Sequence, residues 1–319
     1  MTTTRPVRRT LTRLALSLIV VTLLGGALVV GDALQAPGDD QPTAKLAEWG
    51  RDHGLNPVVT WLEAAQYEQA PPEVGGLPPG GVPAAAGAVT PTTGAPSAST
   101  PASRFPHPAP VPALPPLAAG PALPGEGQWQ TVVAFHGGFR LSDPSHNGYF
   151  SEGRTVRPLV DGKASLVLHT DGTADVGTWG TEVRMAPDVA SVRQNLLPLV
   201  DGGQVNPTCA TGGQAEWGST VGQAAYIHRS GFGVTATGAE VYVGGPALSV
   251  CTLGRILQNA GVVRGMELDI NPTWVSGTYF HDQPGGAPQG FRLFDAERVA
   301  PGHYLIPTSR DWYAWYLRP

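Results

Sequence analysis

The feature that most constrains the fold is a run of 55 residues, 71–125, that does not code for a hydrophobic core. Sixteen of them are proline, the rest are mainly Ala, Gly, Ser and Thr, and only Glu73 and Arg104 are charged. This composition favours extended, disordered chain with a reach of up to roughly 170 Å at ~3.1 Å per residue. The run is therefore predicted to be a linker between two separate parts, either a spacer whose length matters or a plain connector.

The N-terminal part contains a membrane-anchor pattern. Residues 14–31 are 18 consecutive uncharged, mostly apolar positions, close to the ~20 that a spanning helix needs. Four arginines lie in residues 1–13, and acidic residues follow the apolar run, which orients the N-terminus toward the cytoplasm. The pattern predicts a cytoplasmic tail and a single-pass signal anchor in the lipid bilayer of the cell membrane, with everything after it extracytoplasmic. A cleaved signal peptide, cut near Ala33, is the alternative.

Residues 32–70 are predicted to form a short membrane-proximal pair of helices. Thr43 is a candidate N-cap for the first helix, which Gly54 would end. Asn56 followed by Pro57 is typical of the start of a second helix. We expect the pair to pack on the membrane surface or on the following domain through an apolar stripe on the second helix: Val58, Trp61, Leu62 and Ala65.

Residues 126–319 form the one part long enough to bury a sizeable core. Strand patterns occur at residues 131–135, 156–160, 164–170, 224–229, 232–236, 240–243, 266–270 and 312–317. One helix is expected after Thr252, which would cap it, and Gly261 would end it. The prediction is an α+β domain with mostly antiparallel strands and few helices. Its acidic surplus, 17 acidic against 13 basic residues, argues against a nucleic-acid partner.

Cys209 and Cys251 are the only cysteines. Both lie in the part predicted to be outside the membrane, where disulfides persist. A disulfide between them is therefore predicted, and two independent buried thiols are the alternative.

Common cofactor and catalytic motifs are absent from the sequence. It contains no phosphate-binding P-loop, no CxxC, no HExxH and no EF-hand spacing. Ser230 lacks the first glycine of a GxSxG elbow, which argues against a serine hydrolase. The six histidines of residues 126–319 are scattered without ligand spacing. No metal site is expected, and no cofactor is assigned.

A glycine pair is the first of three places where chemistry is concentrated. Gly137 and Gly138 follow His136 at the end of a predicted strand, and Asn147 comes shortly after. Glycines at a strand end let the backbone approach a ligand closely. The structural alternative is a tight turn next to core aromatic residues.

An arginine at a strand end is the second place. Arg229 and Ser230 precede Gly231 in the run HRSGFG. A guanidinium group suits a phosphate or carboxylate because its N–H groups form two parallel hydrogen bonds. The alternative is a structural salt bridge.

Two carboxylates on one strand are the third place. In the run MELDI, strand alternation puts Glu267 and Asp269 on one face, ~7 Å apart, opposite Met266, Leu268 and Ile270. Such a pair suits acid and base work at a sugar carbon, because nearby like charges separate the two pKa values. The alternative is a half-exposed strand with both acids in solvent.

Taken in order, the motifs AFHGGF, NGYF, DGTADVGTWG, LVDGG, RSGFGVTATGAEVYVGG and MELDI resemble the phosphodiester glycosidase family of uncovering-enzyme-like domains. The resemblance covers most of residues 129–280. His136 stands where the family usually has Asn, Ser230 where it has Thr, and MELDIN in place of the LDGGGS motif. This last feature looks like a variant found in membrane-anchored envelope proteins of actinobacterial type.

The resemblance implies an extracytoplasmic glycoside hydrolase that acts on a sugar-1-phosphodiester in the cell envelope. It implies that Asp269 is the acid/base or oxocarbenium stabiliser, that Glu267 is its partner, and that His136 donates a proton or contacts phosphate. Arg229 would clamp the phosphate, and the remaining substrate-binding residues would be Ser230, Gly137, Gly138 and Asn147. A non-catalytic module that binds envelope glycan, or a structural module on the same fold, is the alternative, so enzymatic activity is left open.

Overall fold

The computed structural model describes residues 30–36, 40–69, 130–141, 147–281, 288–308 and 310–317. Within these ranges, the chain folds into three antiparallel sheets with few helices, which confirms the predicted mostly antiparallel domain. The predicted tail at 1–13, the linker at 71–125 and all but the end of the predicted anchor at 14–31 lie outside the described residues. Among the described residues, no helix is long and apolar enough to cross a membrane.

The strand orders of the sheets are β13-β12-β1-β14, β10-β9-β11-β7-β8 and β3-β2-β6-β4-β5. The strands are β1 Gln130–His136, β2 Tyr149–Ser151, β3 Arg154–Arg157, β4 Ala164–His169, β5 Ala174–Thr178, β6 Val189–Gln194, β7 Pro198–Asp201, β8 Gln204–Val205, β9 Ile227–Thr235, β10 Glu240–Leu248, β11 Val262–Ile270, β12 Gly277–His281, β13 Gln289–Arg292 and β14 Trp312–Leu317. The α-helices are α2 Pro42–Asp52, α3 Asn56–Gln69, α4 Gln214–Trp217 and α5 Val250–Asn259, and the 3₁₀ turns are η1 Pro207–Ala210, η2 Val221–Gln223 and η3 His303–Leu305.

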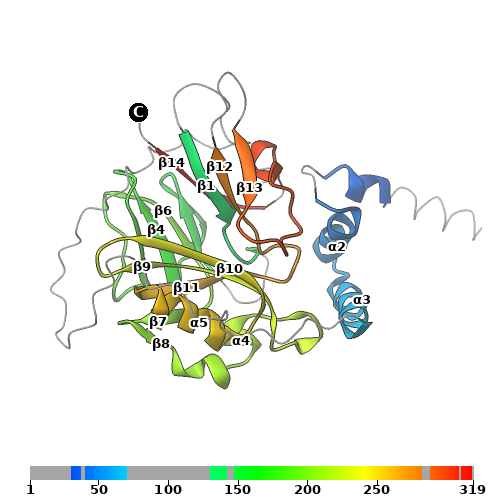
Figure 1. Cartoon of the computed structure of the whole chain (residues 1–319), viewed down its shortest axis with the longest axis horizontal. Helices are drawn as coiled ribbons and strands as arrows, with labels where there is room; N and C mark the ends of the chain where they lie inside the picture. The colour runs from blue at the N-terminus through cyan, green and yellow to red at the C-terminus, as the bar shows by residue number, and fades with distance from the viewer. Residues whose placement is uncertain are drawn as a thin grey trace, which may run out of the picture.

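The main core lies where the three sheets meet. Phe135 of β1, Leu166 of β4 and Met266 of β11 belong to one buried cluster, although they come from different sheets. A second cluster joins α5 to the β7 side of the β9–β11 sheet. Figure 1 shows this sheet across the middle of the domain, with α5 on one side and β1, β12 and β13 on the other. Strand β11 is central in its sheet, and its residues 265–270 are all buried, so both of its faces are covered.

Two predicted strands, 224–229 and 232–236, are one continuous strand, β9. Gly231 does not break it, because it stays in register with Val243 of β10 and Glu267 of β11. The strand predicted at 156–160 is also displaced, because β3 ends at Arg157. The α5 helix was predicted correctly, but its cap is Ser249, whose side chain accepts from the backbone N–H of Thr252.

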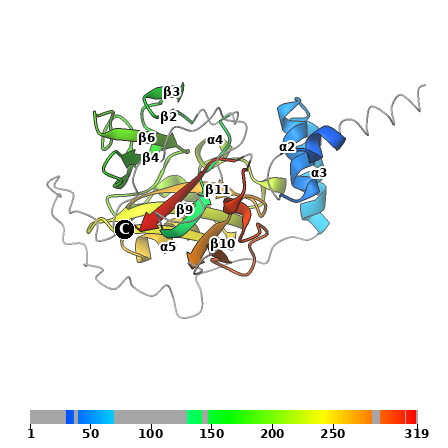
Figure 2. The ribbon, with the colours of Figure 1, turned by 90° about the horizontal axis from the view of Figure 1, so that it is seen from above.

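The two N-terminal helices form as predicted, with two differences. Helix α2 begins at Pro42 with Gln41 as its N-cap, so Thr43 is not the cap. Among the side chains of α3 whose burial the structure describes, Val59 is buried, whereas Val58 is 52% exposed and Trp61 is 67% exposed. Most of the apolar stripe is therefore exposed, and its packing on a membrane surface stays a prediction. Figures 1 and 2 both place α2 and α3 at one end of the domain.

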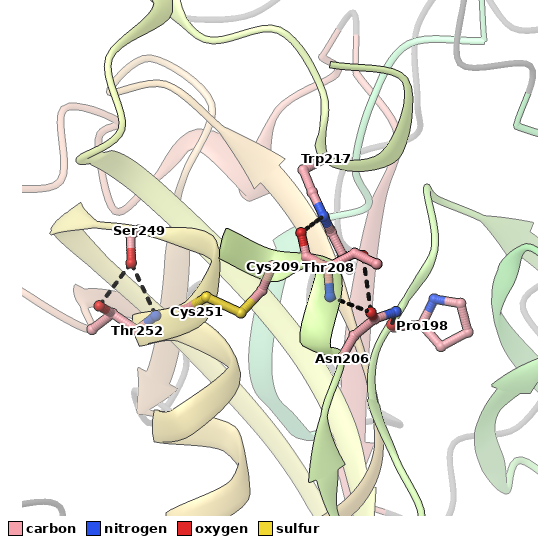
Figure 3. Close-up of a disulfide and its surroundings, with 8 residues drawn as sticks. All are labelled: Pro198, Asn206, Thr208, Cys209, Trp217, Ser249, Cys251 and Thr252. Atoms are coloured by element: carbon pink, nitrogen blue, oxygen red, sulfur yellow. Dashed lines mark hydrogen bonds between the residues drawn. A yellow bond between two sulfur atoms is a disulfide. The ribbon is translucent and has the colours of Figure 1, made fainter. Parts of the chain in front are cut away.

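The predicted disulfide is present. Cys209 of η1 and Cys251 of α5 are bonded, with their Cα atoms 5.0 Å apart. Around the bond, Asn206 accepts from the backbone N–H of Thr208, and the Trp217 indole donates to the Thr208 carbonyl (Figure 3). The disulfide thus ties the loop after β8 to the first turn of α5.

Candidate active site

Glu267 and Asp269 are both buried, with exposed fractions of 0% and 2%. The alternative interpretation, a half-exposed strand with both acids in solvent, is therefore wrong. The alternation of apolar and acidic residues in β11 suggests one solvated face, but the strand is central in its sheet and covered on both sides. A carboxylate buried in this way needs a partner, because desolvation disfavours its charge.

A bulge in β11 lies at this point of the sequence. Glu267 pairs with Gly231, whereas Ile270 pairs with Arg229, so β11 has one residue more than β9 between these pairs. Ser230 holds the bulge: its hydroxyl donates to the Asp269 carbonyl and accepts from the Asp269 N–H, both at 3.1 Å. A bulge re-aims the side chains around it, and here the two acids bind different arginines.

Asp269 is held by donors on both of its oxygens. Arg310 donates from Nη2 to Oδ2 at 2.7 Å, and the Ile270 N–H donates to Oδ1 at 3.0 Å. The same Arg310 nitrogen donates to the Gly138 carbonyl at 3.1 Å, and the guanidinium lies 4.4 Å from the Trp274 ring centre. Arg310 therefore connects β11 to the glycine turn and to an aromatic face.

Burial raises the pKa of Asp269 to about 6, although Arg310 and the Ile270 N–H act in the opposite direction. A carboxylate with this pKa exchanges its proton close to neutral pH. The two hydrogen bonds that it accepts favour its charged form. Asp269 is thus suited to accept a proton.

Arg229 and Glu267 form a second buried pair. Arg229 donates from Nη1 to Glu267 Oε1 at 2.5 Å and from Nε to the Leu248 carbonyl at 3.0 Å. Burial raises the pKa of Glu267, and Arg229 opposes this effect. Both partners come from neighbouring strands of one sheet, so this guanidinium is enclosed by the sheet. The structure thus places Arg229 in the salt bridge given above as the alternative to a phosphate contact.

His136 lies in a buried histidine pair. Its Nδ1 is 2.7 Å from the Trp274 carbonyl, and its Nε2 is 3.3 Å from Nε2 of His303. Because a carbonyl only accepts, Nδ1 carries the proton and Nε2 is the acceptor in the neutral ring. Burial, with His303 and Arg310 nearby, lowers the pKa of His136 well below its usual range. This environment suits a neutral His136.

The predicted glycine turn lies beside Asp269's arginine. Gly138 has φ +126°, a conformation that side chains disfavour, and its carbonyl accepts from Arg310. At Gly137 there is no room for a side chain, because an added Cβ would lie 2.6 Å from a carboxylate oxygen of Asp311. Asp311 in turn accepts from Arg193 at 2.8 Å.

Asn147 binds the segment that holds β11. Its amide donates to Asn195 Oδ1 at 3.0 Å and its oxygen accepts from the Leu196 N–H. Asn195 then donates to the carbonyls of Glu267 and Leu268, at 2.8 and 2.7 Å. Asn147 therefore positions β11 through Asn195.

The structure joins most predicted site residues into one network around β11. Sequence reasoning missed Arg310, His303 and Asn195, and it gave Trp274 no role. Arg310 lies directly before β14 in a stretch without a motif, so its only signal was a lone arginine at the start of an aromatic strand. Within the described ranges, no group of three or more His, Cys, Asp or Glu side chains is arranged to hold a metal ion.

No protein-family model matches the chain, and neither does any curated protein. Among solved structures, the chain is similar to the catalytic domain of zebrafish N-acetylglucosamine-1-phosphodiester alpha-N-acetylglucosaminidase, with 13% identity and a TM-score of 0.38 over 59% of this chain and 64% of that one. It is also similar to a hypothetical protein from Synechocystis, with 12% identity and a TM-score of 0.31 over 61% of this chain and 55% of that one. The chain thus spans less than two thirds of either.

Proposed function

We propose that the protein is an extracytoplasmic, membrane-anchored phosphodiester glycosidase-like hydrolase that cleaves a sugar-1-phosphodiester in the cell envelope. The observation that supports it is Asp269, a buried carboxylate whose pKa is raised to about 6, bound to Arg310 beside Trp274. A base and a cation for a phosphate lie together, and the Trp274 ring packs on the guanidinium.

In the proposed reaction, water attacks the anomeric carbon while the bond from that carbon to the phosphate oxygen breaks. Asp269 accepts the proton of the attacking water, and the phosphate group leaves with the bonding electron pair as a monoester. A phosphate monoester is a weak base, so the leaving group requires little protonation. Asp269 therefore works as a general base, and its charge also stabilises the cationic sugar of the transition state.

The other residues position this base. Arg229 holds Glu267 so that β11 keeps its bulge, and Ser230 fixes the backbone of Asp269. The Gly137–Gly138 turn accepts from Arg310, and His136 packs next to Trp274. In this proposal Glu267 and Asn147 are positioning residues, and Arg310 takes over the phosphate contact first assigned to Arg229.

The test is release of free sugar by the full-length chain from a panel of sugar-1-phosphodiesters. Asp269→Asn keeps the size of the side chain but removes the base, so we expect a loss of about 10²- to 10⁴-fold in rate. Asp188→Asn, at an exposed carboxylate paired with His169, is the matched control and should retain full activity. Equal rates for parent and Asp269→Asn would refute the mechanism.

A non-catalytic envelope-binding module is the second candidate. The observation that favours it is the closure of the site, because Asp269 is only 2% exposed. Saturable retention on envelope glycan, with no sugar released from any substrate, would establish this function in place of hydrolysis.

A further inference from the structure

Helix α2 packs against the site through a carboxylate. Glu48 is only 6% exposed, although it belongs to a short helix at the edge of the domain. Its Oε1 forms an ion pair with Arg140 and lies 3.8 Å from Nη1 of Arg310. One carboxylate of α2 thus lies between two arginines that come from distant parts of the chain.

The two arginines carry more charge than the domain itself neutralises. Asp269 pairs with Arg310, but the ion pairs of Arg140 within the described residues are both with α2, namely with Glu48 and with Asp52 at 2.9 Å. Glu48 and Asp52 are four residues apart, so they share one face of the helix. Without α2, the guanidinium groups of Arg140, Arg193 and Arg310 face, among the described residues, only the carboxylates of Asp269 and Asp311, which leaves one positive charge in excess.

The contact with Glu48 does not use all the hydrogen-bond donors of Arg310. A separation of 3.8 Å is an ion-pair distance but too long for a hydrogen bond. Nε of Arg310 is also buried with no hydrogen-bond partner among the described residues. A phosphate has more acceptor oxygens than a carboxylate and suits two converging guanidinium groups better.

We infer that Arg140 and Arg310 form a phosphate-binding site that Glu48 of α2 occupies in this structure. The site lies across the Arg310 guanidinium from Asp269, so a bound phosphate and the base contact the same arginine. A ligand's phosphate and the Glu48 carboxylate therefore exclude one another. That this phosphate belongs to the substrate's sugar-1-phosphodiester rests on the function proposed above, whereas anion binding itself does not.

The first experiment removes the carboxylate and supplies an anion. In the full-length chain, Glu48→Ala leaves space between the two arginines. Inorganic phosphate at constant ionic strength should fill it and raise Tm saturably by roughly 3 °C or more at about ten times its Kd. The matched control is Glu63→Ala, which breaks the Arg51–Glu63 pair within the same helix pair. Control and parent should respond little.

Two results would overturn the inference. One is a phosphate response of Glu48→Ala no larger than that of Glu63→Ala. The other is an unchanged response in Glu48→Ala/Arg140→Ala, since this double variant lacks one of the two guanidinium groups. Arg140 is partly exposed, so its loss is compatible with folding.

A milder variant keeps the test decisive if Glu48→Ala does not fold. Glu48→Gln retains the side-chain volume but removes the charge that competes with phosphate. Phosphate should then speed hydrogen exchange in residues 42–52, because it displaces the weakened helix. Unchanged exchange at saturating phosphate would contradict the inference.

The outcomes also separate this inference from the proposed function. A phosphate response that needs Arg140, without sugar release from any phosphodiester, would refute the hydrolase and retain the anion site. Sugar release that depends on Asp269, with no phosphate response in the Glu48 variants, would support the hydrolase and refute the anion site.

Discussion

Two buried arginine–carboxylate pairs lie on strand β11, and they differ in what surrounds the guanidinium. Arg229 reaches Glu267 from the neighbouring strand and donates to a carbonyl of β10, so its surroundings belong to one sheet. Arg310 reaches Asp269 from the segment before β14 and touches the glycine turn, Trp274 and helix α2.

The difference shows that one strand holds one acid within its own sheet and the other where a sheet, a turn and a helix meet. Altering a pair that is enclosed by its own sheet should lower only the stability of the protein. A pair in which sheet, turn and helix meet lies where a ligand can displace one of them. Glu267 and Asp269 lie two residues apart on the same strand, so the sequence pattern does not distinguish them. Their arginine partners do.

The largest expected effect concerns the enclosed pair. Glu267→Leu leaves the Arg229 charge buried without a carboxylate and should destabilise the protein by about 3 to 5 kcal/mol, measured by denaturant unfolding. Adding Arg229→Met removes that charge, and stability should return close to that of the parent, because well-packed apolar groups often replace a buried ion pair.

The same exchange can be made at the Asp269–Arg310 pair. Asp269→Leu/Arg310→Met should abolish sugar release whether or not stability returns. If Arg229→Met/Glu267→Leu also abolished release while folding like the parent, Glu267 would belong to the chemistry and the distinction would fail.

The next effect is a pH dependence with opposite signs for activity and stability. The pKa of Asp269 is raised from 3.8 to about 6, so its contribution to stability is fully present below pH ~4 and is lost as pH rises through ~6. As a base it must be ionised, so the sugar-release rate should rise about tenfold per pH unit below ~6 and level off above it.

Asp269→Asn is the control for the stability part of this prediction. Burial raises the pKa of Glu240 and of Glu297 to about 7, so stability should still fall toward pH 7 in the variant, but by less between pH 4 and 6. A rate that falls as pH rises through 6 would identify Asp269 as an acid and contradict the assigned role.

The smallest effect concerns the bulge. Ser230→Ala removes both hydrogen bonds that the hydroxyl makes with the Asp269 backbone, which should lower stability by about 1 to 3 kcal/mol and Tm by a few degrees. Activity should fall as well, because the base moves. Ser191→Ala loses one bond to the Phe150 carbonyl and should lower Tm without affecting turnover.

Much of the fold could be predicted from local patterns. Strand patterns at residues 164–170 and 312–317 indicated β4 and β14, and two cysteines in a part predicted to be extracytoplasmic indicated the disulfide. These features depend on neighbours in sequence or on simple counting. The continuity of β9 was not predictable in this way, because cross-strand pairing keeps Gly231 extended where local propensity favours a turn.

For the site, the sequence indicated candidate side chains: two acids on one strand, a glycine pair after His136 and an arginine before Ser230. Their partners depend on the tertiary structure. Arg310 lies 41 residues from Asp269, and Asn195 lies 72 residues from Glu267. Burial on both faces of β11 and a one-residue bulge set these contacts, and both arise from long-range packing, which local periodicity does not encode.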